Sequence, residues 1–229
     1  MKTPIAILNL EKLHNTKFQV IFKDWTQYEG KVSVRFNQNT FFITKFKNTT
    51  DKEIESAANK EVKIILENPG FITENVRVIY PDYFFLLGEK LNYKIENNFI
   101  LIFKKDEFLE KIFLKNLSKV SETLMDWIKI KLLEKCKLIQ REMEKIMNIP
   151  EHTISLKTSR TYHAQHRKNH ITYNINVYPF PDEIIRFLAT HELCHYVHPN
   201  HSKLFYEMLF KYCPNHKLLK IKLNKGVVL

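Results

Sequence analysis

The sequence predicts an α+β fold. It has a β-rich N-terminal region, a long connecting helix and a compact C-terminal core with one helix packed on a small sheet. Short segments rich in Val, Ile, Phe and Thr dominate residues 1–105, whereas apolar residues recur at close to helical spacing over residues 106–148. The 229-residue chain is 44% hydrophobic and holds 17 Phe and 10 Tyr, enough for a substantial core.

Residues 1–105 form the first predicted region, which contains strands and one helix. Strands are expected at "KFQVIFKDW", "KVSVRF" and "TFFITKF" within residues 17–46, with "YEGK" at 28–31 as a hairpin turn. Thr50 or Asp51 begins a helix over residues 49–68, because apolar residues then follow at helical spacing. A second pair of strands is expected within residues 83–105.

Residues 106–229 form the second predicted region, which begins with the long helix. That helix spans residues 106–148, as one piece or with a kink near 116–118, and Pro150 ends it. Strands are expected at 153–158 and 170–180. Pro181 suits the first turn of the next helix, Pro199 ends it, and Ser202 is a plausible N-cap for another.

The stretch "HELCH" lies on the helix between Pro181 and Pro199. Because residues four apart lie one turn above each other, His191 and His195 can direct both imidazoles at one point. Zn²⁺ accepts imidazole nitrogen at about 2.0–2.1 Å. Glu192 lies one residue further round the helix, where it can reach a water on the metal as a general base. Cys194 points away from the ligand face and is interpreted as a buried packing thiol.

A catalytic zinc site needs a third protein ligand and an open fourth position. His198 extends the helix past His195, so its imidazole is expected further along the axis. His201 follows Pro199, where the chain can turn back, and is the preferred candidate. His198 and Glu207 remain alternatives.

Three more histidines lie upstream in "RTYHAQHRKNHITYN". His163 or His166 could point towards the site and steady an oxyanion. The favoured interpretation places both, with His170, in a solvated basic loop that also carries Arg167 and Lys168.

The formal net charge is +11, which raises affinity for nucleic acid and other polyanions. No apolar run is long enough for a transmembrane helix, so no membrane partner is expected. We find no targeting segment, and the three cysteines show no C-x-x-C pairing. A reducing, cytoplasmic location is therefore expected.

The stretch "THELCHYVHPNHSKLFYEMLFKYCPNHK" resembles the C-terminal signature of the YgjP-like metallopeptidases, relatives of the SprT-like and WLM zinc peptidases. Upstream, "HITYNINVYPFPDEIIRFLATHEL" and "FFLLGEKLNYKIE" are similar to earlier segments of that family. The resemblance extends over about residues 17–220, as one unit. Tyr162-His163-Ala164 stands where family members commonly carry Trp-Gly-Ser. The matching signature positions are His191, Glu192, Leu193, His195, Asn200, His201, Ser202, Phe205 and Pro214.

The resemblance implies a zincin-like core in which His191, His195 and His201 bind Zn²⁺ and Glu192 is catalytic. His198 is then left as a residue at the helix end beside the ligands. The resulting hypothesis is a zinc-dependent peptidase that cleaves a protein or peptide with a metal-activated water and Glu192 as general base. The strand at 170–178 could pair with an extended substrate. The alternative is a basic, nucleic-acid-associated zinc protein of SprT-like type with latent or DNA-linked protease activity.

Overall fold

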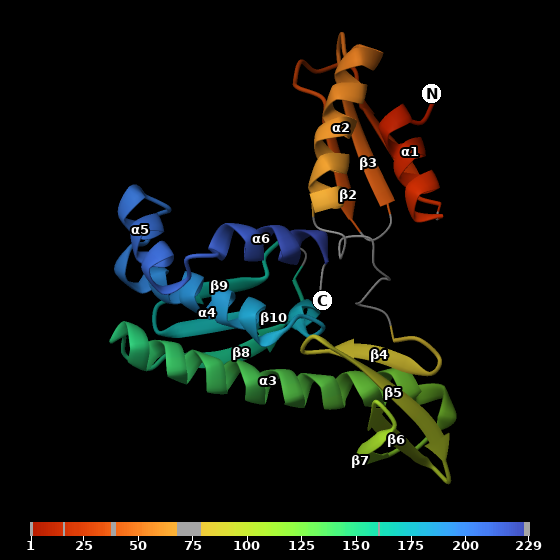
Figure 1. Ribbon diagram of the computed structural model, residues 1–229. Coiled ribbons are helices and arrows are strands. Elements are labelled where there is room, and N and C mark those ends of the chain that lie inside the picture. Colours follow the sequence, from red (N-terminus) through yellow and green to blue (C-terminus); the bar gives the residue numbers. More distant parts are fainter. Residues whose placement is uncertain (1, 16, 38–39, 68–78, 160, 227–229) are drawn as a thin grey trace. The chain divides into compact units, whose positions relative to one another are not determined.

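The computed structural model describes residues 2–15, 17–37, 40–67, 79–159 and 161–226 (Figure 1). The chain divides into two compact units between residues 75 and 76, and residues 224–227 group with the first unit. This division differs from the predicted one at residue 105, which falls in the turn between two paired strands. Among the described residues, no helix is both long enough and apolar enough to cross a membrane.

The first unit combines a three-stranded sheet with two helices. The sheet has the order β1-β3-β2, with β1 (Gln19–Trp25) parallel to β3 (Thr40–Phe46) and β2 (Ser33–Asn37) antiparallel to it. The three predicted strands are present. The predicted hairpin turn at 28–31 is wrong, because β3 lies between β1 and β2.

The prediction of a single helix in this region is also wrong. Helix α1 (Ile5–His14) precedes the sheet, and its Ile7 and Leu10 pack in the same buried cluster as Ile54 and Ala58 of α2 (Asp51–Glu67). The ten residues of α1 make fewer than three turns, too short for a stable isolated helix, so packing against α2 stabilises α1. The expected cap of α2 is present, since the backbone N–H of Thr50 donates to Glu53 Oε2 at 2.8 Å.

The second unit begins with an antiparallel meander of four strands. These are β4 (Tyr83–Leu86), β5 (Glu89–Glu96), β6 (Phe99–Lys104) and β7 (Glu107–Phe113). Each connection is a two-residue turn with positive φ at both positions, Leu87-Gly88, Asn97-Asn98 and Lys105-Asp106, as hairpins with the right-handed strand twist require.

Strand β7 corrects the predicted helix start at Asp106. Glu110 of β7 pairs with Lys131 of the following helix at 2.8 Å, so alternate residues of this segment face that helix as in a strand. Helix α3 (Val120–Met147) begins only after a short 3-10 turn, η2 (Leu117–Lys119), and ends at Asn148 in the left-handed conformation. The four-residue spacing of Leu109, Phe113 and Leu117 does not mark a helix here, because Leu109 and Phe113 lie in β7 and Leu117 lies in η2.

A second, smaller sheet follows α3. Its order is β8-β10-β9, so β10 (His170–Asn174) is central, parallel to β8 (Thr153–Lys157) and antiparallel to β9 (Ala164–Arg167). β10 ends at Asn174, earlier than predicted, and η3 (Ile175–Val177) follows. The last helices are α4 (Asp182–Val197), α5 (Lys203–Tyr212) and α6 (His216–Lys225). Helix α4 packs against α3 and β9 (Figure 1), and the predicted α+β class is confirmed.

The β4–β5 turn holds the segment that leads into α4. Leu87 N–H donates to Tyr178 O at 2.7 Å, and Gly88 N–H donates to Pro179 O at 2.8 Å. Gly88 has φ +84°, and a Cβ there would lie 2.8 Å from Pro181 Cβ. Only glycine combines this backbone conformation with such a close approach, so the turn fixes the start of α4.

Candidate metal centre

Three histidines from the end of α4 and the following loop meet at one point. His191, His195 and His201 each offer one ring nitrogen, and these nitrogens lie within 4.8 Å of one another. The Nε2 atoms of His191 and His201 face each other at 3.1 Å. Nitrogens bound to one tetrahedral zinc at about 2.0–2.1 Å would lie about 3.3 Å apart. The spacing therefore fits one shared ion.

Local sequence explains how His201 reaches the other two rings. Pro199 follows the last turn of α4, and Ser202 caps α5 by accepting the N–H of Phe205 at 3.4 Å. The Phe205 ring is fully buried, with its centroid 5.0, 4.7 and 4.7 Å from those of His191, His195 and His201. One phenyl ring on α5 thus packs against all three imidazoles.

His198 contributes through its backbone. His195 Nδ1 lies 3.3 Å from His198 O, so a proton on Nδ1 can be donated to this carbonyl while Nε2 is left as the free nitrogen. His198 is the extended C-cap of α4, and its imidazole is not in the cluster. Glu207, the carboxylate alternative, pairs with Lys203 at 3.5 Å.

The environment of His191 and His201 favours their neutral imidazole forms. Burial, and then the neighbouring His195 and His201, lower the pKa of His191 to about 3. Burial also lowers the pKa of His201. Neutral imidazole is the form that binds a metal, so the donor set fits a divalent ion that accepts nitrogen ligands.

Glu192 is only 6% exposed, and burial raises the pKa of its carboxyl group to about 7. A backbone hydrogen bond from His166 on β9 acts in the opposite direction. A carboxylate beside the histidines is thereby tied to the edge of the small sheet. Cys194, on the same helix, is fully buried as predicted, and burial raises its thiol pKa to about 12.

These groups open into a cavity of about 410 Å³. Besides the three histidines and Glu192, β9 and the loop before it supply part of the wall. The full lining comprises Tyr162, Ala164, Gln165, His166, His191, Glu192, His195, Pro199 and His201.

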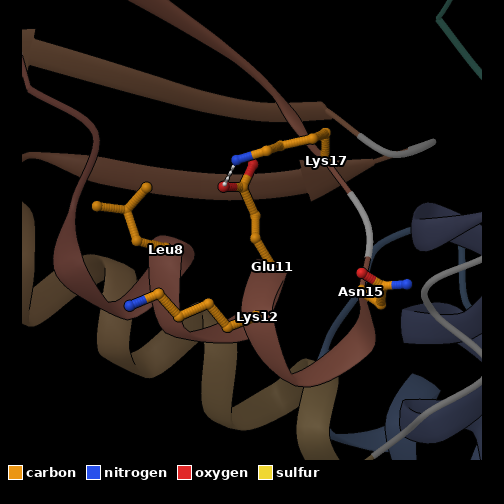
Figure 2. A pocket seen from close by; sticks show the side chains of 5 residues that line it. All are labelled: Leu8, Glu11, Lys12, Asn15 and Lys17. Carbon is orange, nitrogen blue, oxygen red and sulfur yellow. Dashed lines mark hydrogen bonds and ion pairs between the residues drawn. The ribbon is translucent and has the colours of Figure 1, made fainter.

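The first unit has a hollow of a different kind, of about 360 Å³, between α1 and the start of β1 (Figure 2). Its one carboxylate is already engaged. Glu11 pairs with Lys17 at 3.2 Å and accepts the N–H of Phe18 at 2.9 Å. We therefore place the candidate chemistry in the second unit.

The upstream histidines separate in the fold. His166 lines the cavity, whereas His163 is absent from its described lining and uses its carbonyl to accept the N–H of Asn174 at 2.8 Å. His170 lies between Thr153 Oγ1 and Ser155 Oγ at 2.7 and 2.8 Å. The favoured interpretation as a solvated loop is wrong for Ala164–Arg167, which form β9 and pair antiparallel with β10 across the two residues Lys168 and Asn169.

A buried polar network behind the sheet was missed at the level of sequence. Gln140 donates to Glu144 at 2.7 Å and accepts the hydroxyl of Tyr173 at 3.1 Å, and Glu144 also accepts the N–H of His152 at 2.8 Å. These contacts fasten α3 to β8 and β10. The available signal was a Gln and a Glu on the apolar stripe of α3, where polar residues need buried partners.

Comparison with known proteins assigns the class. Residues 30–226 match the family model described as YgjP-like, metallopeptidase domain. The chain belongs to this family, and its class is that of a metallopeptidase. A metal ion is implied by that class.

Two further comparisons, with solved structures and with curated proteins, do not extend this assignment. The crystal structure of the metallopeptidase zymogen of Methanocaldococcus jannaschii jannalysin aligns with 22% identity and a TM-score of 0.37, over 41% of this chain and 97% of that one. No curated protein matches the chain.

Proposed function

We propose that the protein is a zinc-dependent peptidase in which His191, His195 and His201 hold the ion and Glu192 is the general base. The observation that carries the proposal is the meeting of three imidazoles beside a buried carboxylate in one cavity. Three protein nitrogens with an open fourth position are the ligand set of catalytic zinc sites.

The chemistry divides between the ion and the chain. Bound zinc supplies Lewis acidity, towards both an attacking water and the scissile carbonyl. Glu192 takes a proton from the attacking water and returns it to the leaving amine. The His166 N–H holds the Glu192 carboxylate in place, and the His198 carbonyl orients His195.

The free edge of β9 is the proposed site for an extended substrate. The predicted role of the 170–178 strand in substrate pairing is wrong, because β10 has a neighbour on each side. In the β9–β10 ladder Asn174 N–H bonds to His163 O, so odd-numbered β9 residues face β10 by alternation. The backbone groups of Ala164 and the carbonyl of His166 then point to the free edge, while the His166 N–H is bonded to Glu192. A peptide added there would lie along the cavity.

The test compares metal content with hydrolysis. Purified protein, loaded with Zn²⁺ and desalted, is measured by inductively coupled plasma mass spectrometry and assayed on β-casein. We expect one zinc per chain and measurable cleavage. Glu192→Gln should keep the zinc and lose at least about 100-fold in rate, as expected for removal of a general base.

The matched control is Glu207→Gln, which changes an exposed carboxylate on α5. It should keep both zinc and activity. Absence of stoichiometric zinc in the wild type, or full activity in Glu192→Gln, would overturn the proposal.

A further inference from the structure

The outer face of the β4–β7 sheet carries an ordered array of aromatic and basic side chains. Alternation along the strands buries Leu91, Tyr93, Ile100 and Ile102 on the side that packs with α3. The opposite side is partly or fully exposed, except at Phe85, the partner of Lys90, which is buried. By register it carries Tyr83, Lys90, Asn92, Lys94, Glu96, Phe99, Leu101, Phe103, Phe108, Lys111 and Phe113.

The aromatic residues of this outer face lie in two rows across the strands. Phe99 and Phe113 are direct partners with ring centroids 5.6 Å apart, and Phe103 and Phe108 are partners at 6.0 Å. Phe108 is 55% exposed and Phe113 58% exposed. The two rows are four residues apart on β6, about 13 Å at the usual strand rise. Large apolar rings at such exposure mark a binding surface more often than a chance arrangement.

Lysines lie between and beside the aromatic rows. Lys94 and Lys111 flank Leu101 in the register between the two rows. Lys111 Nζ lies 3.8 Å from the centroid of Phe99, Lys94 Nζ lies 5.6 Å from Phe103, and Lys90 Nζ lies 3.6 Å from Tyr83. On the outer face, a row that contains lysines therefore lies between two rows of aromatic rings.

These three lysines have no carboxylate within 4.0 Å in the part of the chain that the structure describes, unlike two other lysines near the sheet. Lys104 pairs with Glu89 at 3.1 Å, and Lys131 pairs with Glu110 at 2.8 Å. Glu96, at the end of the outer face, is the one acidic residue in its register rows. The face thus has a net positive charge on a chain of +11.

We propose that this outer face binds single-stranded nucleic acid. Exposed rings offer stacking platforms for bases, and ammonium groups between them offer contacts for the phosphates that link those bases. An apolar protein partner would have to bury three ammonium groups without counter-charges, which is costly. Phosphates supply those counter-charges, so charge complementarity selects the nucleic acid.

The proposal does not depend on the proposed peptidase site. The residues of the outer face belong to β4–β7, and the cavity is lined by β9, α4 and the loop after it. Because every base has a π-face, stacking on these rings predicts binding with little sequence preference.

The experiment measures fluorescence anisotropy of fluorescein-labelled oligothymidylate of 20 nucleotides with the full chain. A duplex of the same length and vesicles with 30% phosphatidylserine are parallel probes. We expect the single strand to bind more tightly than the duplex at 0.1 M salt. Phe99→Leu with Phe113→Leu should weaken single-strand binding by at least about 10-fold, since the apolar bulk stays and the π-face is removed.

Removing the lysine charges of the outer face should weaken the salt dependence of nucleic-acid binding. Lys90→Gln, Lys94→Gln and Lys111→Gln together should reduce the slope of log affinity against log salt by about 2. The matched control is Lys23→Gln with Phe42→Leu, which removes a similar pair from the first unit, where Lys23 Nζ lies 5.6 Å from the Phe42 centroid. It should bind like the wild type.

Several outcomes would overturn the proposal. These are equal affinity for duplex and single strand, an equal loss in the Lys23/Phe42 control, or binding of vesicles alone. Thermal unfolding of each variant, compared with the wild type, checks that the sheet is intact. If the leucine pair unfolds early, the three-glutamine variant alone decides, and an unchanged salt slope rejects the idea.

Discussion

The two sheets of the second unit expose different parts of the polypeptide. The small β8-β10-β9 sheet exposes an edge, where backbone groups of Ala164 and His166 lie beside Glu192. The β4–β7 sheet exposes a face, where side chains such as Phe113 and Lys111 project. An edge is suited to recognising any extended peptide through its backbone, while a face is suited to recognising chemistry carried by rings and charges. The same unit therefore offers two surfaces that can be altered separately.

The largest effect is expected on zinc affinity, when one of the clustered histidines is substituted. His201→Ala should lower zinc affinity by at least about 100-fold, because it removes a direct ligand, whereas changes to groups that only orient ligands cost 10- to 100-fold. His198→Ala keeps the carbonyl that His195 contacts and should retain the metal. Competition with a fluorescent zinc chelator measures both. Equal losses in the two variants would contradict the assignment of His201.

Gly88 joins the β4–β5 turn to the segment before α4, and its substitution should destabilise the second unit. Gly88→Ala combines a left-handed φ with a Cβ 2.8 Å from Pro181 and should cost about 1–3 kcal/mol. Asn98 has a comparable turn conformation at φ 63°, and Asn98→Ala should lower the free energy of unfolding by about 1 kcal/mol. Urea unfolding followed by Trp127 fluorescence in a Trp25→Phe background reports on this unit. A smaller loss for Gly88→Ala than for Asn98→Ala would contradict the described contact.

The edge of β9 can be tested with proline. Ala164→Pro removes an N–H that points to the free edge, so kcat/KM for an extended peptide should fall about 3- to 10-fold, the effect of one hydrogen bond. Gln165→Pro removes an N–H that faces β10 and should instead lower stability. Kinetics and thermal unfolding of both variants distinguish these effects. Unchanged kinetics in a folded Ala164→Pro protein would argue against the edge as a substrate site.

The smallest effect on hydrolysis is expected when a residue on the outer face of the β4–β7 sheet is substituted. Phe113→Leu changes no residue of the cavity lining and should leave casein cleavage within about twofold of the wild type. The assay is the one used for Glu192→Gln. A larger fall in hydrolysis would show that the two surfaces are coupled.

The features that could be predicted from the sequence are those that depend on contacts between residues close together in the chain. His191, Glu192 and His195 were predicted together because helical spacing alone brings them together. His201 also joins the cluster, but its position depends on how α5 packs through Phe205, which spacing left open. The cap at Thr50 and the N-cap at Ser202 were equally local.

The missed elements depend on partners that their own sequence pattern does not reveal. β9 is four polar-leaning residues, "AQHR", with no apolar alternation, and only pairing with β10 and packing against α4 make it a strand. β7 has Leu109 and Phe113 at helical spacing, but pairing with β6 makes the segment a strand. Gln140 and Glu144 find their partners in Tyr173 and His152, on strands that follow α3. The contact of Gln140 with Tyr173, 33 residues further along the chain, and the packing of β9 against α4 lie outside any one sequence window.

The contact of Gly88 with Pro181 sets a limit on how the chain can be shortened. A fragment that begins at residue 106 retains the three histidines, Glu192 and the small sheet. It lacks the turn whose N–H groups bind Tyr178 O and Pro179 O, so the entry to α4 loses two partners at once. The smallest excisable piece that keeps the histidine helix anchored therefore includes the β4–β5 hairpin, and truncation should begin no later than residue 79.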